Sequence, residues 1–216
     1  GGDNGPHIIF PAVLTALQQS PHLHFILCGP LPLMSQWLDK QLTSIQTRIS
    51  LSDCPQLVAM DEAPAHALRH KKNSSMRRIL DLVANNQADA CVSGGNTGAL
   101  ISMAYFVLKT LPGIDRPALI TVVPTINNGK VYFLDLGANI NCDSEVLFQY
   151  AVMGSVLAEH IANIKQPKVA LLNVGSEEIK GNDQVKKTAR LLTDAKNINY
   201  IGYVEGNDIF SQKADV

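Results

Sequence analysis

The sequence has few cysteines and no close pair of them. Its four cysteines, Cys28, Cys54, Cys91 and Cys142, are too far apart for a Cys-x-x-Cys pair, so the usual spacing of a zinc knuckle is missing. Cys28 and Cys91 lie in apolar stretches, where a cysteine acts as a small hydrophobic residue. We therefore expect four free thiols in a reducing cytoplasm, and no metal site.

An excess of charge of one sign is also missing. The 216 residues include 18 Lys and Arg against 19 Asp and Glu, which leaves a net charge of −1 and no electrostatic basis for binding nucleic acid. No apolar run approaches the roughly 18 residues that a membrane-spanning helix needs. Hydrophobic residues nevertheless make up 46% of the chain, which excludes intrinsic disorder and permits a buried core.

Several common catalytic and nucleotide-binding motifs are missing too. The chain has no Gly-x-Ser-x-Gly nucleophile elbow, no Gly-x-Gly-x-x-Gly fingerprint and no P-loop. His66 and His70 are four residues apart, but the glutamate of a His-Glu-x-x-His zinc motif does not follow His66. These absences count against an elbow-type hydrolase and make a nicotinamide-dependent dehydrogenase the weakest enzymatic interpretation.

Short apolar runs alternate along the chain with longer helical patterns. Strands are expected at residues 24–28, 48–51, 57–60, 88–92, 118–123, 130–134, 168–173 and 199–203. Helices are expected at residues 7–19, 31–43, 63–70, 74–86, 98–111, 144–163 and 183–195. Some strands, such as Val169–Leu172, are continuously apolar, as strands buried on both faces are. The pattern predicts a single α/β domain over residues 1–216, with a mostly parallel sheet and helices on both sides.

Glycines and small polar residues follow several expected strands. In open parallel sheets the loops at the carboxyl ends of strands line the ligand crevice, where glycines let backbone N–H groups approach an anion. The clearest such loop precedes an expected helix, whose dipole favours an anion, although a tight structural turn is an equal interpretation. Its candidate donors are Ser93, Gly95, Asn96, Thr97 and Gly98. Another loop, Asp135–Asn139, follows the strand at 130–134.

The stretch 69–78 carries five basic residues and no acid. The basic residues are Arg69, Lys71, Lys72, Arg77 and Arg78. Between them, Asn73, Ser74 and Ser75 are candidate N-caps of the helix expected there. Cations before a helix start oppose the helix dipole, so the stretch indicates an anionic partner, unless it is simply a solvated basic face.

Residues 177–182 place two acids, a lysine and a glycine before another expected helix. Glu177 and Glu178 are adjacent and are interpreted as solvated acids. Lys180 stands beside the helix start, which suits a contact with a phosphate or a carbonyl oxygen. Taken alone, the residues predict an α/β protein with an anionic, phosphate-bearing ligand at its strand ends.

Seven short motifs together resemble the bacterial phosphate acyltransferase (PlsX) family. They are Gly1–Asp3, Lys71–Met76, Gly95–Leu100, Asp115–Leu119, Leu134–Asn139, Ile179–Asn182 and Asn199–Gly202. Each motif is weak alone, but their order and spacing are specific and cover essentially the whole chain. The resemblance implies a Rossmann-like α/β/α sandwich related to isopropylmalate dehydrogenase and phosphotransacetylase.

The resemblance also implies a reaction. Inorganic phosphate attacks the thioester of a long-chain acyl-acyl carrier protein and gives acyl phosphate and free carrier protein. A membrane glycerol-3-phosphate acyltransferase then uses the acyl phosphate in phospholipid synthesis. The family implies a homodimer without a cofactor, in the cytoplasm or peripheral at the inner face of the membrane. Because phosphate is itself the nucleophile, no side chain needs to be acylated.

We assign the residues roles on this basis. Lys180 contacts phosphate or the carbonyl oxygen, with the helix start at Asn182 beside it. The segments Asn73–Ser75 and Ser93–Gly98 donate hydrogen bonds to phosphate or the oxyanion. The remaining assignments are substrate orientation by Asp135 and Asn139, a place at the crevice for Asp3, and docking of the acidic carrier protein by the basic residues of 69–78.

Two departures and two alternatives accompany the resemblance. Gly94 stands where the family more often has Ala, and Asn4 stands where it often has Phe or His. The family continues past the position of Val216, so we expect a fragment that lacks the first strand and the C-terminal third and does not fold stably or catalyse alone. The alternatives are a phosphotransacetylase that uses an acyl-coenzyme A thioester and a non-enzymatic module that docks a carrier protein.

Overall fold

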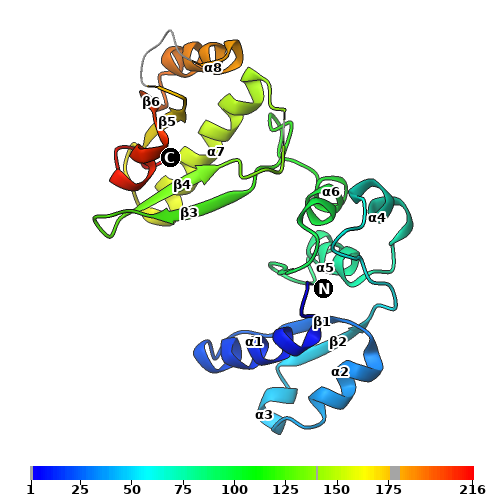
Figure 1. Cartoon of the computed structure of the whole chain (residues 1–216). Helices are drawn as coiled ribbons and strands as arrows, with labels where there is room; N and C mark the ends of the chain where they lie inside the picture. The colour runs from blue at the N-terminus through cyan, green and yellow to red at the C-terminus, as the bar shows by residue number, and fades with distance from the viewer. Residues whose placement is uncertain (1, 140, 176–180) are drawn as a thin grey trace. The chain divides into compact units, whose positions relative to one another are not determined.

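The computed structural model describes residues 2–139, 141–175 and 181–216 (Figure 1). Its contacts divide the chain into two compact units, Gly1–Lys109 and Thr110–Val216, and each is described by itself. Both units combine helices with a pair of parallel strands. The predicted α/β class is therefore confirmed, and the alternation of elements is consistent with a Rossmann-like α/β/α fold. The prediction of a single domain stays a prediction.

The first unit packs helices around one pair of parallel strands. In chain order its elements are α1 (Pro6–Gln19), β1 (Phe25–Gly29), α2 (Leu31–Leu38), α3 (Thr43–Gln46), β2 (Ile49–Asp53), α4 (Pro64–His70), α5 (Ser75–Ala84) and α6 (Thr97–Leu108). Strands β1 and β2 pair in parallel, with Phe25 opposite Ile49. One core cluster joins α1 and α2 to these strands through Phe10, Leu17 and Met34.

A second core cluster of the first unit joins α4, α5 and α6. Its buried side chains are Val58, Ala67, Met76, Leu80, Ala99 and Met103. Met76 and Leu80 are four positions apart and lie on one face of α5, as helical spacing requires. This packing brings the start of α5 close to the start of α6, where two of the predicted site segments lie.

The second unit contains an antiparallel and a parallel strand pair. Its elements are β3 (Ile120–Pro124), β4 (Lys130–Leu134), α7 (Ser144–Ala162), β5 (Lys168–Leu172), α8 (Asp183–Asp194), β6 (Asn199–Val204) and the 3₁₀ helix η1 (Gly206–Ser211). β5 and β6 pair in parallel, with Lys168 opposite Asn199. Residues 215–216 hydrogen-bond to both β4 and β5, because Tyr132 N donates to Asp215 O (2.8 Å) and Ala170 N donates to Val216 O (2.9 Å).

The pairing of β3 with β4 departs from the predicted mostly parallel pattern. These two strands form an antiparallel hairpin, with Ile120 opposite Leu134. The turn between them contains Asn128 with a φ of 58°, followed by Gly129, whose N–H donates to the Thr125 hydroxyl (2.9 Å). An Asn-Gly pair between two strands is a strong hairpin signal. The sequence therefore carried this signal, and the prediction missed it.

Two predicted strands and the extent of one helix are wrong. Near residues 57–60 the structure has only an isolated bridge between Gln56 and Ser74. Residues 88–92 pair with no strand in the described parts of the chain, and Val92 is 90% exposed. An apolar run becomes a strand only where a neighbour completes its hydrogen bonds. The helix predicted at 31–43 is two helices, α2 and α3, with a short break between them.

Within the described residues, no helix has both the length and the apolar character needed to cross a bilayer.

Candidate functional site

The Gly-rich turn before α6 lies against the N-terminal loop and the start of α5. A Cβ atom on Gly95 would lie 2.9 Å from Met76 Cε, and a Cβ on Gly2 would lie 2.7 Å from Gly94 O. Gly2 also has a φ of +82°, a backbone conformation that residues other than glycine rarely adopt. Three predicted segments, around Asp3, Ser74 and Gly95, therefore meet in the first unit, and Asp3 itself is exposed.

Asn96 is the hydrogen-bonding centre of this turn and is only 8% exposed. Its Oδ1 accepts from Ala99 N (3.0 Å), so Asn96 is the N-cap of α6. Its Nδ2 donates to three carbonyl oxygens, those of Ala59 (3.2 Å), Met60 (3.0 Å) and Glu62 (2.9 Å). The side chain is fully engaged in holding the turn to the segment before α4, and its role as a substrate donor stays a prediction.

The other residues of the turn differ in how open they are. Ser93 Oγ accepts from Gly95 N (3.2 Å) and so closes the turn on itself, while Gly95 is buried. Thr97 and Gly98 are exposed in the first turn of α6, a helix of 12 residues. These two are therefore the positions of the motif at which a ligand has access to the helix start.

Ser74 is the N-cap of α5. Its hydroxyl donates to Lys71 O (2.7 Å) and accepts from Arg77 N (3.2 Å), and the residue is fully buried. The predicted cap is thereby confirmed, but this side chain is occupied. Its neighbour Asn73 is exposed, and Ser75 is half-buried.

Part of the basic stretch is paired with acids of the same unit. Arg77 Nε lies 2.8 Å from Asp81 Oδ1, one turn further along α5, and Lys71 Nζ lies 3.9 Å from Glu62 Oε2. Arg69, Lys72 and Arg78 are exposed, and among the described residues no acid forms an ion pair with them. Docking of a carrier protein on this surface stays a prediction, carried mainly by these three.

Asp135 and Asn139 form one compact network in the second unit. Asp135 accepts from Leu119 N (2.7 Å), Ala138 N (3.3 Å), Asn139 N (2.8 Å) and Asn139 Nδ2 (3.3 Å). Asn139 Nδ2 also donates to Pro117 O (2.9 Å) and lies 2.7 Å from the Tyr150 hydroxyl. Burial raises the pKa of Tyr150 well above its usual value, so the phenol keeps its proton. The network shapes the loop after β4, and its predicted role in orienting a ligand stays a prediction.

Asn182 is the N-cap of α8, since its Oδ1 accepts from Val185 N (2.8 Å). Gly181 before it has a φ of +97°, and a Cβ there would lie 2.5 Å from Asn173 Oδ1. Glycine is therefore required where this helix start approaches the end of β5. Lys180, Glu177 and Glu178 lie outside the described residues, so the predicted role of Lys180 stays a prediction.

The cysteines are free, as expected. Burial raises the pKa of the Cys28 thiol to about 11 and raises the pKa of Cys54, Cys91 and Cys142 as well, which keeps them poor nucleophiles. Within residues 2–139, 141–175 and 181–216 no three His, Cys, Asp or Glu residues gather as metal ligands. His66 instead stacks on His70 with ring centroids 4.5 Å apart.

Glu62 gives the first unit a pH dependence that can be measured. The hydrogen bond with His66 and the Ala59 N–H hold the pKa of Glu62 below its usual value. The stabilisation is present above the unfolded-state pKa and is lost as the pH falls through the folded-state pKa. We expect the free energy of unfolding of Glu62→Gln to fall less than that of wild type as the pH is lowered below about 4.5. Urea denaturation at several pH values measures this. Glu159→Gln, at an exposed position, is the control, and an unchanged pH slope in Glu62→Gln would contradict the prediction.

Comparison with known proteins supplies a family. Residues 1–216 match the model of a family described as fatty acid synthesis protein. The chain is 54% identical to a phosphate acyltransferase of Pseudoalteromonas atlantica, and 53% identical to phosphate acyltransferases of Shewanella woodyi and Shewanella halifaxensis. Each comparison covers 100% of this chain but 63% of the relative, so the chain spans less than two thirds of the length of these curated relatives.

Proposed function

The chain belongs to the fatty acid synthesis protein family, and on this basis we propose that the complete protein is a phosphate acyltransferase. An oxygen of inorganic phosphate attacks the thioester carbonyl carbon, a carbon–oxygen bond forms, and the carbon–sulfur bond breaks. The products are an acyl phosphate and a thiolate, which takes up a proton and becomes the free thiol. The identity of 54% over the whole chain to a relative named phosphate acyltransferase is the observation that carries this proposal.

The proposed reaction does not need a strongly acidic or basic side chain. The leaving thiolate has an ordinary thiol pKa of about 8.5 and departs without a strong general acid. What the site must supply is a fixed phosphate and donors for the oxyanion. The exposed start of α6 at Thr97 and Gly98 supplies oriented N–H groups, held in place by Asn96. In the second unit, Lys180 and the α8 start at Asn182 are the proposed contacts for phosphate or the carbonyl oxygen.

We further propose that the acyl donor is a long-chain acyl-acyl carrier protein. The exposed cations Arg69, Lys72 and Arg78 suit an acidic carrier protein. In this proposal the protein is a cytoplasmic homodimer, able to lie at the inner face of the membrane, and its product feeds phospholipid synthesis through a membrane glycerol-3-phosphate acyltransferase. An acyl-coenzyme A donor, as in phosphotransacetylases, is the competing possibility.

Lys180→Ala tests the central chemical assignment. We expect kcat/KM for acyl phosphate formation by the complete protein to fall at least about tenfold, because a charged donor to phosphate or the carbonyl oxygen is lost. Lys180→Arg should restore part of the rate. The assay measures acyl phosphate with acyl-carrier protein and with acyl-coenzyme A as donors, each with and without phosphate.

The matched control is Lys187→Ala, which removes the same charge from an exposed position on α8. It should leave the rate unchanged. A wild-type rate in Lys180→Ala would show that Lys180 takes no part in the reaction. If neither donor gives acyl phosphate, the proposed function is wrong. If only acyl-coenzyme A gives acyl phosphate, the acyl donor is acyl-coenzyme A and not acyl-carrier protein.

A further inference from the structure

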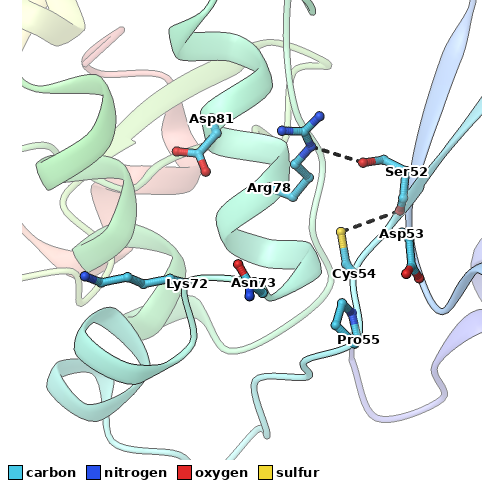
Figure 2. A pocket seen from close by; sticks show the side chains of 8 residues that line it. All are labelled: Ser52, Asp53, Cys54, Pro55, Lys72, Asn73, Arg78 and Asp81. Atoms are coloured by element: carbon cyan, nitrogen blue, oxygen red, sulfur yellow. Dashed lines mark hydrogen bonds between the residues drawn. The ribbon is translucent and has the colours of Figure 1, made fainter.

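A cavity of about 420 Å³ opens in the first unit between the end of β2 and the start of α5 (Figure 2). It is lined by residues 52–55 on one side and by Lys72, Asn73, Arg78 and Asp81 on the other. In Figure 2 Arg78 lies beside Ser52, whereas the Lys72 side chain points away from Arg78, on the far side of Asn73. The prediction placed Asn73 in the substrate site and Lys72 and Arg78 on a docking face, but the structure places all three on one cavity.

Several side-chain hydrogen-bond donors at this cavity have no acceptor among the described residues. Arg78 Nε donates to Ser52 Oγ (3.0 Å), which fixes the plane of the guanidinium. None of the described residues accepts a hydrogen bond from the terminal nitrogens of Arg78, from Lys72 Nζ or from the Asn73 side-chain amide. A guanidinium fork matches the oxygens of a phosphate, and a lysine on its long stem adds a mobile point charge.

The two acids that line the cavity are engaged elsewhere. Asp81 pairs with Arg77 at 2.8 Å, and Asp53 Oδ1 accepts from Leu31 N (3.1 Å) at the start of α2. The Cys54 thiol stays neutral because burial raises its pKa. Because Asp81 is paired with Arg77, which is outside the lining, the charged lining residues without an ion pair among the described residues are Lys72, Arg78 and Asp53. This balance and the free donors favour an oxoanion.

We propose that this cavity binds a phosphate group, held by Arg78, Lys72, Asn73 and the Ser52 hydroxyl. For the identity of the ligand, the inference rests on the proposed function. The phosphate is either the free ion consumed in the reaction or the phosphate of the pantetheine arm on which carrier proteins hold their thioesters. The two share the same tetrahedral anion chemistry, and the experiment separates them.

Binding by the complete protein is measured by titration calorimetry with inorganic phosphate and, separately, with 4′-phosphopantetheine. Arg78→Met should weaken binding of the correct ligand at least about tenfold, and Lys72→Met should weaken it about threefold. Arg78→Lys should fall between wild type and Arg78→Met, because it keeps the charge and loses the fork. Lys40→Met, an exposed lysine that does not line the cavity, should bind as wild type does.

Each outcome decides between the two ligands or against the site. Loss of affinity for inorganic phosphate alone assigns the cavity to the free ion. Loss of affinity for 4′-phosphopantetheine, with or without a loss for inorganic phosphate, assigns it to the pantetheine arm. Unchanged affinity for both ligands in Arg78→Met and in Lys72→Met overturns the proposal. Thermal unfolding of each variant separates lost binding from lost folding.

The proposal and the proposed function fail in different ways. If the protein binds phosphate in an Arg78-dependent manner but makes no acyl phosphate, the proposed binding cavity stands and the proposed function is wrong. If the protein makes acyl phosphate but Arg78→Met has wild-type affinity for both ligands, the proposed function stands and the proposed binding cavity is wrong.

Discussion

Replacing Asn96 by alanine is expected to lower the free energy of unfolding by about 3 kcal/mol. The change removes the N-cap of α6 and takes the donor away from three carbonyl oxygens at once. A lost cap costs about 1 kcal/mol, and polar groups left without a partner account for the rest. The measurement is urea denaturation of the complete protein, followed by circular dichroism.

Two further variants show which part of the Asn96 side chain matters. Asn96→Asp keeps an acceptor for Ala99 N but brings a carboxylate against three carbonyl oxygens, so it should cost at least as much as alanine. Thr97→Ala, at the exposed neighbour, should stay within about 0.5 kcal/mol of wild type. A loss below about 1 kcal/mol in Asn96→Ala would show that the turn does not depend on this side chain.

Replacing Asp135 by asparagine should have an effect of similar size in the second unit, also about 3 kcal/mol. The carboxylate accepts four hydrogen bonds with its two oxygens, and three of them come from backbone N–H groups. An amide keeps one oxygen and turns an N–H₂ group towards donors, so at least one N–H group loses its acceptor. Urea denaturation measures the loss.

The network around Asp135 offers a control and a test of coupling. Asp194→Asn removes the same charge at an exposed position at the end of α8 and should stay within about 0.5 kcal/mol of wild type. Asn139→Ala should cost less when Asp135 is already asparagine, because the two residues share hydrogen bonds. Strict additivity would contradict the coupling of Asp135 to Asn139, and equal stability of Asp135→Asn and Asp194→Asn would contradict a structural role for Asp135.

Local rules were enough to predict most helices and their starts. Ser74, predicted as a cap, accepts from Arg77 N, and Asn182, predicted at a helix start, accepts from Val185 N. A cap is a contact between residues three apart, so the sequence around it contains both partners. The same local signals existed for the Asn128–Gly129 hairpin and for the pairing of Arg77 with Asp81 one turn away, and both were missed.

The α/β alternation, the helix starts at Ser74 and Asn182 and the motifs that assign the family all follow from short stretches of sequence. The packing of each folded unit determines which apolar runs pair as strands and which polar side chains are engaged. Residues 88–92 look like a strand but have no pairing partner in the described chain, and Asn96 binds carbonyl oxygens more than 30 positions earlier. Arg78 likewise reaches Ser52 across 26 positions. Such contacts depend on which elements pack together, a choice made by burial of the whole unit and not by any one segment.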